Sequence, residues 1–162
     1  MIGIVGRPGS GKSSLIVDLV GELSRRGLTV STMMGVDDPA VIDQPGKDSF
    51  RHRDAGAEEV IVTSAQRWAL IHGGAAADGG LLTQMTSVDL VLTEDMGGDG
   101  YPLIEVHRVA TETPPLGRDD PAIVAVVSDG PLDGLQKPVI DLDDLPAVAD
   151  FIVAHMGLAG AV

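Results

Sequence analysis

Short apolar runs alternate along the chain with longer segments whose apolar residues recur at helical spacing. The run Ile2–Val5 is uniformly apolar and predicts a buried strand. In residues 14–26 leucines recur every four positions, which predicts a helix with one apolar face. Apolar residues also share one face of residues 143–156, which predict a closing helix. A strand, a loop and a helix are therefore expected to open the chain, and a helix to close it.

Further apolar runs predict strands at residues 28–33, 59–64, 89–94, 102–107 and 122–127. Residues 67–72 are predicted either as a hairpin partner of 59–64 or as a short helix. Because several strands are apolar throughout and alternate with helical segments, the pattern predicts an α/β fold with a mostly parallel sheet that is flanked by helices and covered on both faces. The length of 162 residues predicts a single domain over residues 1–162. The loop described next predicts that this domain binds a nucleotide.

The sequence GRPGSGKS at residues 6–13 lies between the first predicted strand and the first predicted helix, and it matches G-x-x-x-x-G-K-[ST]. Its glycines let successive backbone N–H groups point at phosphate oxygens, and the helix adds the positive end of its dipole. We expect Lys12 to reach the β- and γ-phosphates and Ser13 to bind Mg²⁺. The motif predicts a P-loop NTPase fold. Its expected nucleotide-binding residues are Gly9, Ser10, Gly11, Lys12, Ser13 and Ser14.

A phosphate loop needs a second acidic group to hold Mg²⁺, usually at the end of another buried strand. Glu94 and Asp95 follow the apolar residues 90–92, and Glu94 is expected to reach the carboxyl edge of the sheet as a metal ligand. An ordinary acidic residue at a strand end is an equally good interpretation. The aspartates that follow the second predicted strand compete for the same role: Asp37, Asp38 and Asp43.

Composition narrows the range of partners. The formal net charge is -13 at pH 7 and the pI is near 4.4, so nucleic acids and anionic membrane surfaces would be repelled. The chain has no cysteine, which excludes a disulfide framework and a thiolate metal site. No apolar run approaches the roughly 20 residues of a membrane span, and no secretory signal is visible. We therefore expect a cytoplasmic protein that binds neither nucleic acid nor membrane.

Lys47, Arg51, His52 and Arg53 lie close together in DQPGKDSFRHRDAGA, residues 43–57, although the chain as a whole is strongly acidic. Asp48 or Ser49 is expected to cap a short helix that turns Phe50 inward and its cations outward. If the next strand belongs to the same parallel sheet, the segment lies at the edge that holds the phosphate loop, where cations can bind a phosphorylated ligand. Local ion pairs with neighbouring aspartates are the alternative. The expected anion-binding residues are Lys47, Asp48, Arg51 and Arg53, with His52 among them.

With these motifs the sequence resembles the molybdopterin-guanine dinucleotide biosynthesis protein B (MobB) family. The resemblance rests on GRPGSGKSSLI and on DQPGKDSFRHRDAGAEEV, which is similar to the family's D-x-P-G-K-D-S-x-R-H-x-x-A-G-A signature. It continues through DLVLTE, PLIEVHR and the C-terminal segment. It implies a homodimer that binds GTP with Mg²⁺, assists a molybdenum cofactor guanylyltransferase, and hydrolyses GTP slowly at most. Molybdopterin is the implied candidate for a second ligand.

The guanine preference follows from this resemblance rather than from the residues. No N-K-x-D follows a predicted strand. Asp129, just past residues 122–127, is a candidate acceptor for guanine N–H groups, although an aspartate in a turn is the more ordinary interpretation.

The chain departs from the family's pattern at two places. The family commonly has Lys-His where this chain has Met33-Met34-Gly35, and Glu-Gly-aromatic-Lys where it has Glu94-Asp95-Met96-Gly97. Two basic positions are missing, so two other functions stay open. A small-molecule kinase of P-loop fold would need an arginine-rich lid. A nucleotide-gated metallocofactor chaperone would need clustered His or Cys ligands, whereas the four histidines are scattered along the chain.

Overall fold

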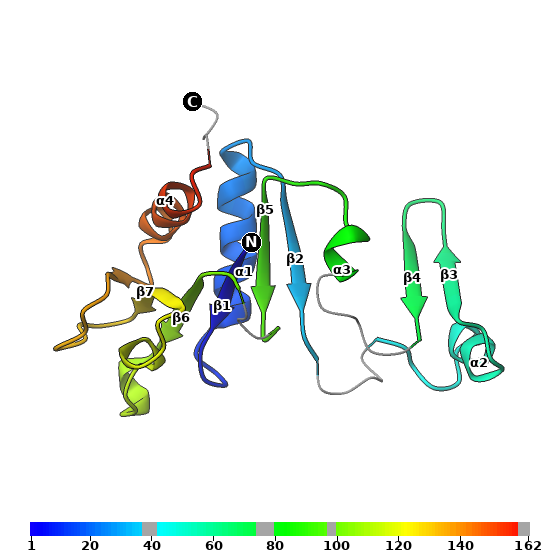
Figure 1. The fold of residues 1–162 in the computed structure, drawn as a ribbon, viewed down its shortest axis with the longest axis horizontal. Coiled ribbons are helices and arrows are strands. Elements are labelled where there is room, and N and C mark those ends of the chain that lie inside the picture. The colour runs from blue at the N-terminus through cyan, green and yellow to red at the C-terminus, as the bar shows by residue number, and fades with distance from the viewer. Residues whose placement is uncertain (37–41, 74–79, 97–99, 159–162) are drawn as a thin grey trace. The chain divides into compact units, whose positions relative to one another are not determined.

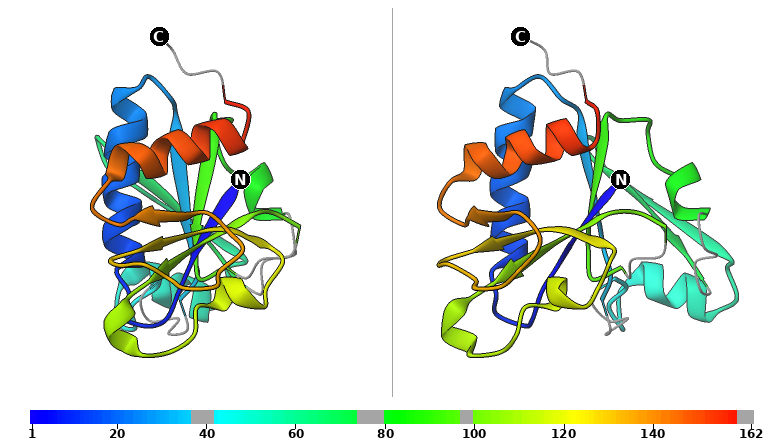
Figure 2. Two further views of the ribbon diagram at one scale, coloured as in Figure 1. Left: turned by 90° about the vertical axis from the view of Figure 1, so that its left-hand side faces the viewer. Right: turned by 60° about the vertical axis from the view of Figure 1, so that its left-hand side comes forward.

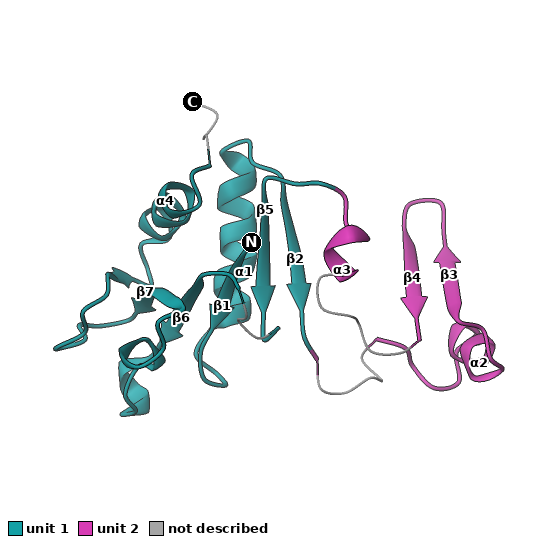
Figure 3. Cartoon of the chain, viewed as in Figure 1, with its two compact units in different colours: residues 1–35, 87–162 teal, residues 36–86 magenta. Residues whose placement is uncertain are grey.

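The computed structural model describes residues 1–36, 42–73, 80–96 and 100–158. The chain divides into two compact units. Residues 1–35 and 87–162 form one, which we call the P-loop unit, and residues 36–86 form the other, which we call the hairpin unit (Figure 3). Each unit is described by itself. The single domain expected over residues 1–162 stays a prediction.

A six-stranded parallel sheet forms the centre of the P-loop unit (Figure 1). The strand order is β2-β5-β1-β6-β7-β8, and every neighbouring pair runs parallel. The strands are β1 (Ile2–Val5), β2 (Val30–Met34), β5 (Leu90–Glu94), β6 (Leu103–His107), β7 (Ile123–Ser128) and β8 (Val139–Asp141). The predicted parallel sheet is confirmed, and β8 is a strand that the apolar pattern did not predict.

Two long helices pack on one face of this sheet. They are α1 (Lys12–Arg25) and α4 (Leu145–His155), which lie against each other in both views of Figure 2. Leucines of α1 and apolar side chains of α4 meet alternate residues of the central strands, such as Ile4 and Ile104, in one buried core. The side chain of Asp144 caps α4 by accepting from the Ala147 N–H at 3.0 Å. Both predicted helices are confirmed.

A smaller core covers the opposite face of the sheet. Leu103, Ile123 and Val126 pack there with partly buried side chains that include Leu132 and Leu135. Two 3₁₀ turns flank this region, η2 (Val109–Thr111) and η3 (Leu116–Arg118). The carboxylate of Glu105, which is 1% exposed, accepts from the backbone N–H groups of Leu116 and Gly117 at 2.9 and 2.8 Å. The buried carboxylate of Glu105 thereby anchors η3 against this face of the sheet.

The hairpin unit contains a short helix and an antiparallel pair of strands. The helix α2 spans Asp48–Asp54, and a four-residue helix, α3, spans Gly80–Thr83. β3 (Glu59–Thr63) pairs antiparallel with β4 (Trp68–His72). The hairpin alternative for residues 67–72 is therefore confirmed. β3 does not join the parallel sheet, so the condition on which residues 43–57 were expected at the edge with the phosphate loop is not met.

The most exposed large apolar side chains of the hairpin lie on one of its faces. Directly opposite residues of an antiparallel pair share a face, which groups Ile61 with Leu70 and, two residues along, with Trp68. Ile61 is 66% exposed and Trp68 is 69% exposed. Among the described residues, no helix is long and apolar enough to cross a bilayer.

Candidate nucleotide-binding site

The loop between β1 and α1 has the backbone that a phosphate cradle requires. Gly6, Gly9 and Gly11 have positive φ values of 152°, 78° and 101°. A Cβ atom on Gly6 would lie 2.5 Å from the Val106 carbonyl oxygen, so only glycine lets the loop lie this close to β6. Gly11 is the N-cap of α1 and turns the chain into the helix, with Lys12 as its first residue. The loop therefore ends on the N-terminal end of a helix dipole, which favours bound anions.

Lys12 lies folded back over this loop. Its ammonium donates to the Gly6 carbonyl at 3.0 Å and to the Arg7 carbonyl at 3.5 Å, and the residue is 9% exposed. The carboxylate of Asp95 lies 3.7 Å from the same nitrogen. The Lys12 ammonium thus lies at the loop, and its expected contact with the β- and γ-phosphates stays a prediction.

Ser13 and Glu94 meet at the same place. The Ser13 hydroxyl donates to Glu94 Oε1 at 2.5 Å, although the two residues are 81 positions apart. Glu94 ends β5 and is 9% exposed. Hydroxyl and carboxylate oxygens are hard ligands of the kind Mg²⁺ prefers, so this pair fits a magnesium ion beside a nucleotide. The pairing is what the metal-site hypothesis requires.

The other loop residues divide between support and exposure. Ser10 is 2% exposed, and its hydroxyl has no hydrogen-bond partner among the described residues. Its backbone carbonyl accepts from Arg108 at 3.0 Å. Ser14 is exposed in the first turn of α1, and Gly9 is open enough that a Cβ atom there would meet nothing within 4 Å. Gly9 and Ser14 thus lie at the surface, whereas Ser10 is buried and its carbonyl anchors the loop to Arg108.

Arg108 is a candidate site residue that the sequence analysis missed. It follows β6 directly, and besides the Ser10 contact its guanidinium lies 3.2 Å from where a Cβ atom of Gly11 would be. It also pairs with Asp129 at 3.4 Å. The available signal was a cation immediately after an apolar strand next to β1, but its contact with the loop spans 98 positions of sequence.

Asp129 is engaged by its own surroundings. Its carboxylate accepts from the Val109 N–H at 2.8 Å and from Arg108. The Val109 hydrogen bond, with a smaller contribution from Arg108, lowers the pKa of the Asp129 carboxyl below its usual value. The ordinary interpretation of Asp129 as a turn residue is therefore favoured over a free acceptor for guanine.

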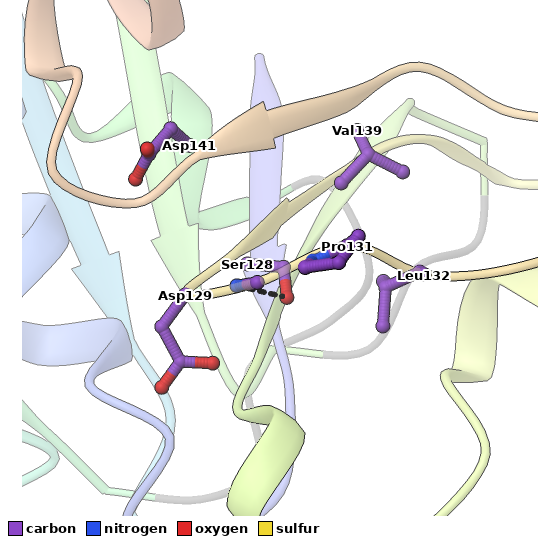
Figure 4. A pocket seen from close by; sticks show the side chains of 7 residues that line it. Ser128, Asp129, Pro131, Leu132, Val139 and Asp141 are labelled. Atoms are coloured by element: carbon purple, nitrogen blue, oxygen red, sulfur yellow. Dashed lines mark hydrogen bonds between the residues drawn. The ribbon is translucent and has the colours of Figure 1, made fainter.

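A pocket of about 410 Å³ opens beside Asp129, at the carboxyl ends of β7 and β8 (Figure 4). Pro131, Leu132 and Val139 form its apolar side, and the carboxylates of Asp129 and Asp141 lie on the other side. The contacts from Ser10 to Arg108 and from Arg108 to Asp129 connect this pocket to the phosphate loop. Adjacent strands are about 4.8 Å apart, so β7 lies roughly 10 Å from β1.

The predicted anion-binding cations lie in the hairpin unit and are largely paired there. Arg53 donates to the carboxylate of Asp43 at 2.8 Å and stacks over the Phe50 ring at 5.3 Å. Arg51 pairs with Asp48 at 3.5 Å, one helical turn away. The expectation that every cation points outward is wrong for Arg53, because a buried aspartate draws it in.

Two further expectations about this segment are decided. The N-cap of α2 is Lys47, without a side-chain capping bond, so neither Asp48 nor Ser49 caps the helix. Asp43, a competing candidate for magnesium, accepts instead from Arg53 and from the Ser49 hydroxyl. Its competitors Asp37 and Asp38 lie outside the described residues. The anion-binding role of Lys47, Asp48, Arg51 and Arg53 stays a prediction.

Comparison with known proteins decides the family. Residues 1–129 match the family described as molybdopterin guanine dinucleotide synthesis protein B, MobB. The chain belongs to the MobB family. It is 34% identical over 156 residues to the molybdopterin-guanine dinucleotide biosynthesis adapter protein of Haemophilus influenzae, which covers 94% of this chain and 86% of the relative. The adapter protein of the same description from Escherichia coli is 33% identical over 155 residues, covering 91% of this chain and 88% of that relative.

Solved structures agree with this family. A crystal structure of molybdopterin-guanine biosynthesis protein B superposes with a TM-score of 0.70 and 25% identity, covering 96% of this chain and 98% of the other. The P-loop NTPase fold expected from the sequence is thereby confirmed. Among the residues that the structure describes in this MobB chain, no group of three or more His, Asp or Glu side chains gathers as a metal cluster. The metallocofactor-chaperone alternative therefore gains no support from the described part of the chain.

Proposed function

We propose that this MobB-family chain binds GTP with Mg²⁺ and acts as an adapter for a guanylyltransferase in the biosynthesis of molybdopterin guanine dinucleotide. The observation that carries the proposal is the 2.5 Å contact between Ser13 and Glu94, beside the folded-back ammonium of Lys12. It brings together the cation and the hard oxygen ligands that a metal-bound triphosphate needs. The names of the curated relatives supply the pathway.

Each residue of the loop has a distinct task in this proposal. The backbone N–H groups around Gly9 and Gly11 bind the phosphates, and Lys12 donates to their oxygens. Ser13 and Glu94 hold Mg²⁺, which when bound neutralises part of the triphosphate charge. Arg108 keeps the loop in place through the Ser10 carbonyl. These roles bind and orient the nucleotide, so we propose that any hydrolysis is slower than about 1 s⁻¹, below the usual kinase range.

The pocket beside Asp129 is the proposed seat of the base. Roughly 10 Å between β1 and β7 is a distance that a nucleotide spans from its phosphates through its ribose to its base. Pro131, Leu132 and Val139 offer an apolar wall to the ring. The carboxylate of Asp141 is exposed; its Oδ1 accepts from the Asp143 N–H at 2.9 Å, and its other oxygen can accept from an N–H group of guanine. Adenine presents an acceptor where guanine presents its ring N–H, so Asp141 would favour guanine. The preference for GTP over ATP rests on this arrangement and on the family.

The partner contacts are proposed for the hairpin unit. The exposed face with Ile61, Leu70 and Trp68 would be buried in a homodimer. Arg51 and Lys47 are exposed on or beside α2 and are the proposed contacts for the guanylyltransferase or for the phosphate of molybdopterin. A cytoplasmic location belongs to the same proposal.

The decisive experiment is a binding titration of the purified chain with GTP and with ATP, each with and without Mg²⁺. We expect GTP to bind more tightly than ATP and the Asp141→Asn variant to reduce that preference. Equal or stronger ATP binding, or rapid phosphoryl transfer to a metabolite, would replace the adapter by a kinase.

The partner role needs a separate measurement. The guanylyltransferase should co-purify with the chain, and the chain should stimulate guanylyl transfer. The double variant Lys47→Ala, Arg51→Ala, which removes the two exposed proposed contacts and leaves the Arg53–Asp43 pair intact, should weaken that stimulation more than it weakens GTP binding. If stimulation is untouched, the cations of α2 are surface charges without a partner.

A further inference from the structure

A second carboxylate lies at the phosphate loop, next to the proposed metal ligand. Asp95 follows Glu94 at the end of β5, and its Oδ1 is 3.7 Å from the Lys12 ammonium. The lysine side chain is 9% exposed and the aspartate side chain is 56% exposed. Glu94 holds Ser13, and Asp95 holds Lys12, so adjacent residues of one strand end occupy both groups that a nucleotide would use.

The backbone keeps Asp95 in this position. Its φ is 51°, in the left-handed region that residues other than glycine seldom occupy. Gly35 lies against it, because a Cβ atom on Gly35 would be 2.4 Å from the Asp95 carbonyl oxygen. The Gly35 N–H also donates to the Glu94 carbonyl at 2.9 Å. The turn is therefore held between the ends of β2 and β5, and the carboxylate stays beside the lysine.

We propose that Asp95 sets the magnesium dependence of nucleotide binding: its carboxylate holds Lys12 in the nucleotide-free chain and competes with the triphosphate for that cation. The inference rests on the proposed nucleotide-binding function. It assigns to Asp95 a role distinct from that of Glu94, since Asp95 acts on the lysine and Glu94 on the metal-binding serine.

Charge explains why magnesium matters. A phosphate oxygen that approaches Lys12 must displace the Asp95 carboxylate, which then remains close to the phosphates as a like charge. At a largely water-screened position such as the exposed Asp95, two like charges about 5 Å apart repel by enough to change a binding constant about fivefold to tenfold. Mg²⁺ at Ser13 and Glu94 brings two positive charges to the same place and offsets the repulsion. Asp95 therefore penalises the free triphosphate more than its magnesium complex.

The test compares Asp95→Asn with the wild-type chain, using a fluorescent GTP derivative in EDTA and again in excess Mg²⁺. In EDTA the variant should bind about fivefold to tenfold more tightly, because the amide neither holds Lys12 nor repels phosphate. In Mg²⁺ the gain should fall below about twofold. Asp95→Gly should behave in the same way and suits the positive φ, so it keeps the test available if the asparagine variant folds poorly.

The matched control is Asp89→Asn, which removes the same charge at the opposite end of β5. Its carboxylate accepts from Thr29, and an asparagine oxygen can still do so. Asp89 is about five residues of strand away from the loop, roughly 17 Å, so its loss should leave both affinities unchanged.

Each remaining outcome decides against the proposal. Equal gains in EDTA and Mg²⁺, no gain in either, or the same gain from Asp89→Asn would overturn it. Weaker binding of Asp95→Asn in Mg²⁺ would make Asp95 a metal ligand instead of a competitor. If the wild-type chain binds no nucleotide under either condition, the proposed function itself fails, which is distinguishable from a wild type that binds and a variant that does not differ.

Discussion

The charged side chains of the two units make different kinds of contact. At the phosphate loop of the P-loop unit, polar and charged side chains connect distant parts of the sequence: Ser13 meets Glu94 across 81 positions, and Arg108 meets Ser10 across 98. Elsewhere in that unit Arg25 and Arg26 pair locally with Glu22. In the hairpin unit the arginines pair within a few residues, Arg51 with Asp48 across three and Arg53 with Asp43 across ten. The unit richer in clustered cations thus uses them mostly to stabilise itself. In the P-loop unit, residues that are far apart in the sequence meet at the phosphate loop.

In this chain, isolated charges at the ends of parallel strands meet at one loop, whereas the clustered arginines of the hairpin unit pair with nearby aspartates. The carboxyl ends of β1, β5 and β6 meet at one edge of the sheet, so a single residue after each strand suffices to build the site. Variants at the loop of the P-loop unit should therefore change nucleotide binding, whereas loss of the paired Arg53 should change the stability of the hairpin unit.

The largest expected effect is on Lys12. Lys12→Ala removes the ammonium that the loop carbonyls hold, and nucleotide affinity should fall at least about 100-fold, as expected for a lost charge-assisted contact with phosphate. The matched control is Lys47→Ala, which removes a lysine from the hairpin unit and should change the affinity less than about twofold. Isothermal titration with Mg-GTP measures both. Retained affinity in Lys12→Ala would remove the site assignment altogether.

The next effect is on stability and tests whether the P-loop unit depends on its buried charge. The Glu105 carboxylate accepts one hydrogen bond from the Leu116 N–H and one from the Gly117 N–H. Glu105→Gln places an amide NH₂ against one of these donors, so the free energy of unfolding should fall by about 2 kcal/mol. Asp48→Asn, at an exposed residue of α2, should cost less than about 0.5 kcal/mol. Urea unfolding of both variants provides the measurement. Similar losses would mean that the two units use charge in the same way.

The distinction between local and long-range contacts also explains how much of the fold and of the candidate site could be predicted from the sequence. The apolar runs predicted the parallel strands because buried strands need continuous apolar residues, and the motif at residues 6–13 predicted the loop because its glycines and lysine are contiguous. Glu94 was predicted because it ends a buried strand. Local patterns thus predicted the fold, which is confirmed, and they supplied the loop and Glu94 of the candidate site.

The rest depends on contacts that no local pattern encodes. Arg108 was missed because its role depends on β6 lying beside β1. The pairing of β3 with β4 removed the premise that placed the cationic segment at a shared sheet edge. The inward turn of Arg53 follows from the burial of Asp43, which reads as one more acidic residue in an acidic chain. Strand neighbours and burial are tertiary properties, so they appear only in the structure.

Arg108 gives the third prediction. Arg108→Ala should weaken nucleotide binding about tenfold, because the loop loses the guanidinium that holds the Ser10 carbonyl. Arg108→Lys should recover part of the affinity, since an ammonium can reach one acceptor but lacks the planar fork that serves Ser10 and Asp129 together. Competition binding with Mg-GTP ranks the three proteins. An affinity for Arg108→Ala equal to that of the wild type would confine Arg108 to a structural role at the surface.

The smallest expected effect separates the two arginines of the hairpin unit. Arg53→Ala leaves the buried carboxylate of Asp43 with only the Ser49 hydroxyl at 3.2 Å among its described partners, so local opening of this unit should become easier by about 1 to 2 kcal/mol. Arg51 is 74% exposed and its 3.5 Å pair with Asp48 is worth less than about 0.5 kcal/mol. Amide hydrogen exchange along α2 and β3 should show the loss of protection in Arg53→Ala alone.

The nucleotide affinities of Arg51→Ala and Arg53→Ala also test whether the charges of the two units have different roles. If the charges of the hairpin unit serve its own stability and its partners, both variants should bind Mg-GTP within about twofold of the wild type. A tenfold loss in Arg51→Ala without any loss of protection would match Arg108→Ala and would place the exposed cation on the phosphates. Arg51, which has the weaker contacts of the two arginines within the hairpin unit, would then be the one that binds nucleotide. Weak internal contacts are expected of a side chain that is available to bind a ligand.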